Sequence, residues 1–307
     1  MPLMLPRRNV LIFHSGALGD FILTWPLAVA LGRIYPQSRI FYITSSQKGK
    51  LAEQALGVES VDVESGWHGL YSDEIILSPT ELKLLASAHT IILFTPRQAD
   101  PVVGRLLQLN PQTNLLPLRP PTGENLTTPA VGFILDQLAS NVVLHTAVRQ
   151  ILRSIAERGI AARHQPRSIY LHPGSGGIGK CWPLESFVEL AHRLRSERLP
   201  LHWVIGEVEH ERLSPKDLNR LEAEGSIIEP ATLLDLHKHV LESRLWIGND
   251  SGPTHLAGMM GVPTIALFGP TDPQIWKPLG PKVHVLRHEP IEHLAVDEVW
   301  SCCRALL

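Results

Sequence analysis

The chain has 307 residues, more than one hydrophobic core ordinarily supports, so its length predicts two packed α/β domains of roughly 150 residues each. Hydrophobic residues make up 44% and charged residues 19%, a balance that is typical of a globular protein and excludes a disordered one. With 28 basic and 30 acidic side chains, the net charge of -2 argues against the broad basic surface that nucleic acid requires.

The sequence predicts no membrane-spanning helix, since it has no uninterrupted apolar run of about 20 residues. Near the start, Arg7 and Arg8 precede only a short apolar run, which favours a buried first strand over a signal peptide. We therefore expect a cytoplasmic protein. The cysteines Cys181, Cys302 and Cys303 match neither a disulfide framework nor zinc spacing, and we expect reduced thiols.

The first half of the chain alternates predicted strands and helices. Residues 9–14 form a β-rich run that ends in a glycine turn, and residues 21–34 follow with helical spacing of apolar residues. Further strands are predicted at residues 39–44 and 90–94, and a further helical stretch at residues 130–158. Residues 96–129 are rich in proline, asparagine and threonine and are predicted as a long surface loop. The alternation is typical of a parallel sheet with helices on both faces.

The second half repeats this alternation after a break near residue 165. We predict an N-terminal domain of residues 1–165 and a C-terminal domain of residues 166–307. Strands of the second domain are predicted at residues 168–171, 201–205, 227–228, 245–248 and 264–268, and helices at residues 183–196, 209–224, 233–242 and 253–260. The last helical stretch, residues 296–307, could pack back on the N-terminal domain. The sequence thus predicts two doubly wound α/β domains.

The first candidate site is the turn Gly16-Ala17-Leu18-Gly19-Asp20, which follows the first predicted strand. Two glycines allow a tight turn there, and ligands of open α/β sheets bind at the carboxyl ends of strands. Asp20 suits a general base, but aspartate is also a common helix N-cap. The residues alone leave both roles open.

Two glycine-bearing turns in the second half resemble anion sites. The run His172–Pro183 carries four glycines and Lys180, which could bind phosphate through backbone N–H groups and one ammonium charge. A flexible loop with a solvated lysine is the alternative. The run Gly248–Ala257 opens a second helix, which Asp250 or Ser251 could simply cap. Two such turns on one sheet edge suggest N–H donors that converge on one anion.

No metal site is predicted. His237 and His239 point in divergent directions on a helix, so a solvated face is the favoured interpretation. Asp62 and Glu64 form an acidic pair, but they lie far in sequence from the two glycine-bearing turns of the second half. We therefore expect neither a metal nor a resident cofactor.

Together these motifs resemble glycosyltransferase family 9, the ADP-heptose:lipopolysaccharide heptosyltransferases. GALGD, then HPGS with KxWP, then DSGPTHLAGMMGVPTIALFGPTDP within Asn249–Pro273 occur in the family's order, and the last block is long and specific. Residues 45–165 resemble the family only in outline. The resemblance implies a GT-B fold, α/β with two Rossmann-like doubly wound parallel-sheet domains that face each other across a cleft. The N-terminal domain would bind the acceptor and the C-terminal domain the nucleotide sugar.

On the acceptor side, Asp20 matches the residue regarded as the family's general base. The resemblance implies that it takes the proton of an acceptor hydroxyl while the anomeric carbon is inverted in one displacement. Two residues depart from the pattern: His14 stands where arginine or lysine is usual, and Gly16 where serine is common. These changes predict a weaker positive charge near the acceptor.

The donor side follows the family pattern more closely. Matched positions around the diphosphate and the donor sugar are Ser175, Lys180, Asp250, Ser251, Gly252 and His255. Lys180 matches a phosphate-binding lysine, although Cys181 replaces the arginine that commonly follows it. An acidic residue after the predicted strand 201–205 usually holds the ribose. The candidates are Glu207, Glu209 and Glu211, of which Glu209 or Glu211 is favoured.

The implied function is an inverting, metal-independent transfer of a sugar, heptose from ADP-heptose, onto a lipopolysaccharide-core-type acceptor. The expected partners are the nucleotide-sugar donor and a lipid-linked or oligosaccharide acceptor. Peripheral contact with the inner face of the inner membrane would suit such an acceptor. The basic stretch 149–163 could contact anionic lipid, although a solvated surface is the favoured interpretation of this stretch. Two alternatives stay open: a catalytically inactive nucleotide-sugar-binding module of the same fold, and a nucleotide-sugar epimerase.

Overall fold

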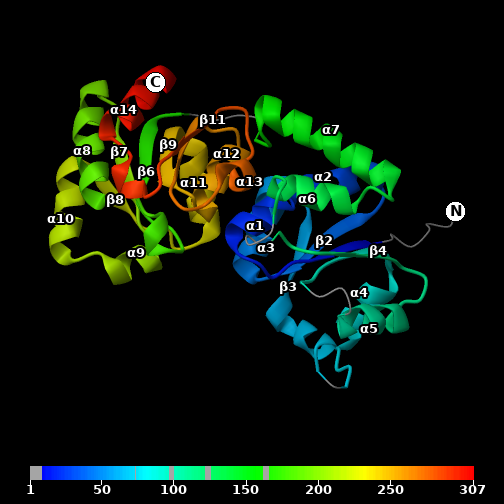
Figure 1. Cartoon of the computed structure of the whole chain (residues 1–307). Helices are drawn as coiled ribbons and strands as arrows, with labels where there is room; N and C mark the ends of the chain where they lie inside the picture. The colour runs from blue at the N-terminus through cyan, green and yellow to red at the C-terminus, as the bar shows by residue number, and fades with distance from the viewer. Residues whose placement is uncertain (1–8, 73, 97–99, 122–125, 162–165) are drawn as a thin grey trace, which may run out of the picture. The chain divides into compact units, whose positions relative to one another are not determined.

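The structure is a computed structural model that describes residues 9–72, 74–96, 100–121, 126–161 and 166–307. The chain forms two compact units, each built around a parallel sheet flanked by helices (Figure 1). Unit 1 comprises Met1–Leu126 and Ala130–Leu152, and unit 2 comprises Thr127–Pro129 and Arg153–Leu307. The predicted boundary near residue 165 lies outside the described residues.

Unit 1 contains a five-stranded parallel sheet in the order β3-β2-β1-β4-β5. Its strands are β1 (Asn9–Phe13), β2 (Arg39–Thr44), β3 (Glu59–Asp62), β4 (Ala88–Phe94) and β5 (Asn114–Leu118). All five residues of β1 are buried, because this apolar strand lies between β2 and β4 in the middle of the sheet. The strand order reverses between β1 and β4, where open α/β sheets bind ligands.

Most helices of unit 1 lie between these strands along the chain, and the last two follow β5. The helices are α1 (Leu18–Leu23), α2 (Trp25–Ile34), α3 (Ser46–Leu56), α4 (Pro79–Ala86), α5 (Pro101–Leu109) and α6 (Ala130–Gln137), and α7 (Val142–Arg158) continues into unit 2. The predicted helix 21–34 is two helices, because the chain bends at Thr24. The Thr24 hydroxyl donates to the carbonyl of Phe21 at 2.7 Å and shares a hydrogen bond with Tyr42 at 2.9 Å.

The predicted long loop 96–129 is wrong, since it contains α5 and the edge strand β5. The α5 helix has clear sequence signals: Asp100 caps it by accepting from the N–H of Val102 at 2.9 Å, and Pro101 occupies its first turn. Leu106 shares its buried face with Val102. Pro117 lies within β5, which is tolerated because that strand is at the sheet edge.

Unit 2 contains a six-stranded parallel sheet in the order β11-β10-β9-β6-β7-β8. Its strands are β6 (Ser168–His172), β7 (Leu201–Val204), β8 (Ser226–Ile228), β9 (Ser243–Asn249), β10 (Thr264–Phe268) and β11 (Val283–Arg287). The order reverses between β6 and β9, so the two glycine-bearing turns of the second half leave neighbouring strands. The predicted doubly wound parallel sheets are therefore present in both units.

The helices of unit 2 are α8 (Leu184–Leu194), α9 (Glu207–Arg212), α10 (Pro215–Glu224), α11 (Leu233–Glu242), α12 (Gly252–Met259), α13 (Pro273–Trp276) and α14 (Val296–Leu306). Two of them, α9 and α10, replace the single helix predicted at 209–224. The α14 helix buries Val299 and Cys303 in the core of unit 2 beside α8, and not on the N-terminal domain as the sequence allowed. Within the described residues, no helix is long and apolar enough to cross a membrane.

Candidate functional site

Side chains cross-link the two turns that follow β6 and β9. The hydroxyl of Ser175 donates to the backbone carbonyl of Asp250 at 2.8 Å. Asn249 connects the turns through both ends of its amide: Nδ2 donates to the carbonyl of Pro173 at 2.7 Å, and Oδ1 accepts from the N–H of Trp182 at 3.0 Å. The two turns that were expected to converge on one anion are therefore held against each other.

A buried carboxylate, that of Asp250, lies at this junction. It is 8% exposed; Lys180 Nζ lies 3.0 Å from its Oδ2, and His255 Nε2 lies 3.6 Å from its Oδ1. Burial alone would raise the pKa of Asp250, but its hydrogen bonds and charge interactions with His255 and Lys180 outweigh burial and hold the pKa below its usual value. Asp250 is thus an anion at neutral pH, with Lys180 as its counter-ion.

The start of α12 adds backbone donors to the same junction. Ser251 occupies the N-cap position, yet its side chain makes no capping hydrogen bond. Its hydroxyl lies 3.4 Å from His172 Nδ1 and 3.1 Å from Thr254 Oγ1. Gly252 is the first helical residue. Neither cap that the sequence allowed, Ser251 or the ion-paired Asp250, is formed. Because Pro253 has no N–H group, the uncapped donors of the first turn are those of Gly252 and Thr254, at the end of the helix that favours an anion.

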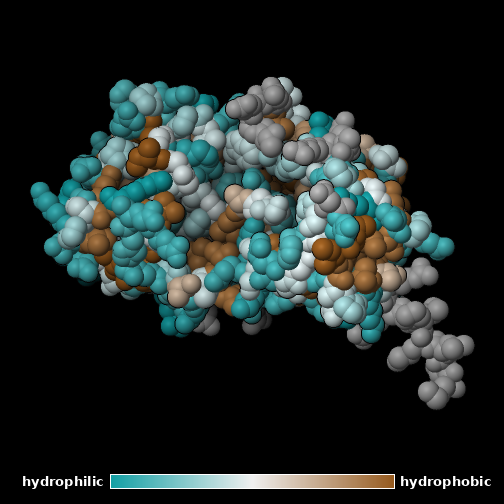
Figure 2. Space-filling view, turned by 90° about the horizontal axis from the view of Figure 1, so that it is seen from below, coloured by the Kyte–Doolittle hydropathy of each residue, from teal (hydrophilic) through white to brown (hydrophobic). Residues whose placement is uncertain are grey.

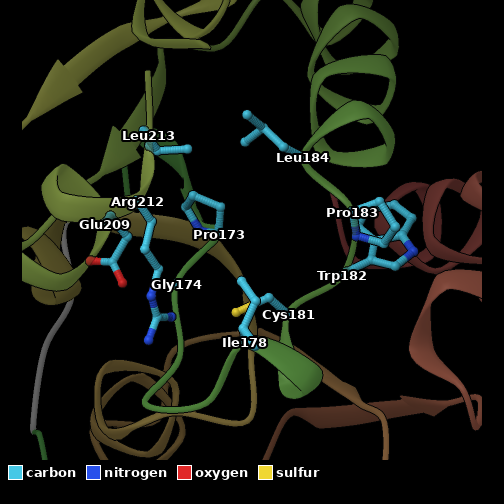
Figure 3. Close-up of a pocket in the computed structure, with 10 residues that line it drawn as sticks. All are labelled: Pro173, Gly174, Ile178, Cys181, Trp182, Pro183, Leu184, Glu209, Arg212 and Leu213. Carbon is cyan, nitrogen blue, oxygen red and sulfur yellow. The ribbon is translucent and has the colours of Figure 1, made fainter. Parts of the chain in front are cut away.

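A pocket of about 230 Å³ opens beside the turn after β6 (Figure 3). Its walls are Pro173, Gly174, Ile178, Cys181, Trp182, Pro183, Leu184, Glu209, Arg212 and Leu213. Most of them are apolar, whereas Glu209 and Arg212 supply two opposite charges from α9. Ile178 at this wall is 72% exposed. Hydrophobic side chains also reach the surface elsewhere, as brown patches between hydrophilic areas (Figure 2).

The structure distinguishes between the three candidate glutamates. Glu209 is buried and lines the pocket, whereas Glu207 and Glu211 are exposed and do not line it. Glu209 Oε2 accepts from the N–H of Gly206 at 2.8 Å. Its Oε1 approaches Gly174 so closely that a Cβ there would lie 1.7 Å away. Glycine at 174 is therefore required for the carboxylate to occupy this place.

Arg212 and Cys181 are pocket residues that the sequence reasoning did not assign to the site. Arg212 Nη1 donates to the carbonyl of Ser175 at 3.0 Å, which ties α9 to the turn after β6. A signal for Arg212 did exist, because it lies three residues after Glu209 on the same helix. Burial raises the pKa of the Cys181 thiol, and the charges of Arg212 and Glu209 act on that pKa in opposite directions.

In unit 1, Asp20 is the third residue of α1, and the N-cap of that helix is Ala17. The N-cap alternative for Asp20 is therefore wrong. Lys48, from α3, donates to the carbonyl of Gly16 at 2.7 Å. Burial lowers the pKa of Lys48, and the negative charge of Asp20 opposes that shift. Lys48 of α3 thus lies close enough to Asp20 for their charges to interact.

The two departures from the family pattern in unit 1 fit each other. His14 is 4% exposed and packs between Phe21 and Phe94, with ring centroids 5.5 and 5.3 Å away. Burial, followed by the charge of Lys48, lowers the pKa of His14 to about 3, so the ring is neutral at physiological pH. A Cβ at Gly16 would lie 3.0 Å from His14 Cε1. Glycine at 16 thus makes room for histidine at 14.

The described residues contain no group of three or more histidine, cysteine, aspartate or glutamate side chains arranged to hold a metal ion. Asp62 instead uses Oδ1 to accept from the N–H of Glu64 at 3.1 Å. His237 is only 5% exposed, so the predicted solvated face is wrong for this residue, which belongs to the buried side of α11.

Comparison with known proteins identifies the family. The sequence model of glycosyltransferase family 9 (heptosyltransferase) matches residues 124–298. The chain belongs to glycosyltransferase family 9. Lipopolysaccharide heptosyltransferase 3 of Escherichia coli is 23% identical to this glycosyltransferase over 302 residues, covering 85% of this chain and 83% of its own.

Two solved structures share the fold of this glycosyltransferase. The family 9 protein from Veillonella parvula DSM 2008 superposes with a TM-score of 0.73 at 18% identity and covers 97% of each chain. E. coli heptosyltransferase WaaC with ADP gives a TM-score of 0.67 at 15% identity, covering 97% of this chain and 100% of that chain. The predicted GT-B fold class is confirmed.

Proposed function

We propose that this family 9 glycosyltransferase transfers heptose from ADP-heptose to a lipopolysaccharide-core acceptor. The proposal is supported most by the junction of two cross-linked turns, where Lys180 and the start of α12 lie beside a pocket that contains a buried carboxylate, Glu209. The similarity to lipopolysaccharide heptosyltransferase 3 favours heptose and this class of acceptor. WaaC, which shares the fold, has been solved with ADP, and this favours an adenine nucleotide.

The pocket suits the nucleoside part of the donor. Pockets for drug-sized ligands occupy roughly 300–1,000 Å³, so about 230 Å³ fits a base and ribose better than a whole nucleotide sugar. The base would lie against apolar walls such as Leu184 and Leu213, and Glu209 would accept hydrogen bonds from the ribose hydroxyls. The diphosphate would then extend toward Lys180 and the N–H groups at the start of α12.

The proposed reaction is a single displacement with inversion. Asp20 takes the proton of the acceptor hydroxyl as its oxygen forms a bond to the anomeric carbon. The bond between that carbon and the phosphate oxygen breaks at the same time, and ADP leaves with the bonding electron pair. Lys180 and the helix N-terminus stabilise the charge that develops on the diphosphate. Asp250, held ionised by its two partners, would orient the donor sugar or Lys180.

Metal independence is part of the same proposal, because the cation at the junction is a lysine side chain. Heptose transfer should therefore continue in EDTA at a rate close to that without it. A loss of turnover that added magnesium restores would contradict this part. A contaminating hydrolase is excluded by measuring ADP release without acceptor in the same buffer.

The test of the function is product analysis with purified protein, ADP-heptose and a lipopolysaccharide-core acceptor. We expect ADP release that depends on the acceptor, together with an acceptor heavier by one heptose in mass spectrometry. Binding of ADP-heptose without any transfer would favour the inactive binding module. A free epimerised sugar nucleotide formed without acceptor would favour an epimerase.

Presenting the acceptor in vesicles would test the proposed peripheral membrane contact, since the protein should then sediment with acceptor-bearing vesicles only.

A further inference from the structure

The short helix α9 presents two charged side chains to the pocket. Glu209 and Arg212 are three residues apart, so they lie on one face of the helix, and both line the pocket (Figure 3). Figure 3 shows them on one side of the pocket, across from Cys181 and Pro183. One guanidinium nitrogen of Arg212 donates to the carbonyl of Ser175 at 3.0 Å. A guanidinium has five N–H donors, so further donors remain for a ligand.

The charges of Arg212 and Lys180 are balanced differently. The ammonium of Lys180 forms an ion pair with the buried Asp250 at 3.0 Å. Within the described residues, no carboxylate oxygen lies within 4.0 Å of the guanidinium of Arg212. An anion at the junction must therefore share Lys180 with Asp250, whereas Arg212 offers a charge that no ion pair offsets.

The potential of Arg212 also reaches the opposite wall. Its charge acts to lower the pKa of the Cys181 thiol, against the larger effect of burial. Cys181 itself contributes no positive charge to that wall. The pocket thus has one unpaired cation, and it is fixed to the backbone of the same turn that carries the glycines.

We propose that Arg212 binds a phosphate of the donor from the α9 side of the pocket, while Lys180 binds the diphosphate from the turn after β6. This inference rests on the proposed nucleotide-sugar function. The planar guanidinium of arginine presents two parallel N–H groups to two phosphate oxygens, a fixed fork geometry that the ammonium of a lysine does not have. Arg212 would thus select for ligands that carry phosphate beside the nucleoside pocket.

The test compares Arg212→Ala with the wild-type protein by calorimetry, using ADP, adenosine and inorganic pyrophosphate as probes. Loss of a hydrogen bond between charged groups should weaken ADP and pyrophosphate binding by about 10- to 100-fold. Adenosine affinity should stay within about 2-fold, because adenosine has no phosphate. Arg212→Lys should fall between these limits, since it keeps the charge and loses the fork. Arg195→Ala, which removes an exposed arginine of unit 2 that does not line the pocket, should bind all three probes like the wild type.

Equal losses for adenosine and ADP would overturn the proposal, because they would show that Arg212 only positions the turn through Ser175. Unchanged ADP and pyrophosphate affinities would overturn it as well, as would a wild-type protein that does not bind pyrophosphate. A wild-type protein that binds pyrophosphate but not ADP would contradict the proposed donor instead. In that case the Arg212→Ala result with pyrophosphate still decides the role of Arg212.

Discussion

The turn after β1 in unit 1 and the turn after β6 in unit 2 occupy equivalent places in two similarly ordered parallel sheets. A histidine ends or follows the inner strand in each case, His14 after β1 and His172 at the end of β6. In unit 2 the turns carry a charged network around Asp250, cross-linked by hydrogen bonds. In unit 1 His14 packs between two phenylalanines, and burial lowers its pKa as it lowers that of His172.

The difference shows that strand order delivers loops to one edge, while the side chains decide what those loops can bind. Unit 2 combines Lys180, Arg212 and a helix start, which together favour a multiply charged anion. The turn of unit 1 combines the carboxylate of Asp20 with Lys48, which donates a hydrogen bond to the carbonyl of Gly16. The imidazole of His14 beside it stays neutral. Such a turn suits an acceptor hydroxyl better than a phosphate. Four predictions test this contrast.

The largest effect is expected from Asp20→Asn. If Asp20 is the general base, turnover should fall by roughly 10²–10⁴-fold. ADP affinity should be unchanged, because the pocket proposed to hold the nucleotide is built by unit 2. Asp62→Asn is the matched control: its oxygen caps a short turn in the same unit, which asparagine does equally well. If Asp20→Asn and Asp62→Asn transferred sugar at similar rates, the proposed mechanism would have no base.

The next effect is expected from Gly174→Ala. The added Cβ would lie 1.7 Å from Glu209 Oε1, so the carboxylate must move out of its place in the pocket. ADP affinity should fall by about 10- to 100-fold if Glu209 holds the ribose. Gly176→Ala in the same turn is the control, because a Cβ there meets no atom within 4 Å. If calorimetry found equal ADP affinity in both variants, the proposal that Glu209 binds the ribose would be wrong.

A smaller effect, on stability, is expected from Asp250→Asn. The pKa of Asp250 is lower in the folded protein than its ordinary value of 3.8, so its ionised form stabilises the fold above that value. This contribution is lost as the pH falls through the lowered pKa. The melting temperature of the wild type should therefore drop more steeply than that of the variant between about pH 5 and pH 3. Parallel melting curves over this range would show that the charged network does not stabilise unit 2.

The sequence predicted the turns of both units because each is a local pattern of strand, glycine and helix. It could not choose between Glu209 and Glu211, since the choice depends on where α9 starts and which of its faces the sheet covers. The prediction that His237 is solvated was wrong for the same reason. Helical spacing shows that two side chains diverge, but it does not show which of them is buried. The hydrogen bond from Lys48 to Gly16 joins residues far apart in sequence, and no local pattern predicts it.

The smallest effect is expected from His14→Phe, which tests whether the turn of unit 1 is neutral. The folded pKa of His14 is about 3 and its ordinary value is 6.5, so between these values the unfolded chain binds a proton that the folded protein does not. His14 therefore costs stability as the pH falls below about 6.5. The phenylalanine variant lacks this proton, and its melting temperature should fall less than that of the wild type between about pH 7.5 and pH 5. Other histidines whose pKa is lowered by burial, such as His172 and the half-buried His202, are common to both proteins and cancel in the comparison. His68→Gln, which changes an exposed histidine of unit 1, should keep the wild-type dependence. If His14→Phe also kept it, the ring of His14 would bind its proton in the folded protein as readily as in the unfolded chain. The turn of unit 1 would then carry a positive charge below about pH 6.5, in contrast to the neutral turn that the lowered pKa of His14 indicates.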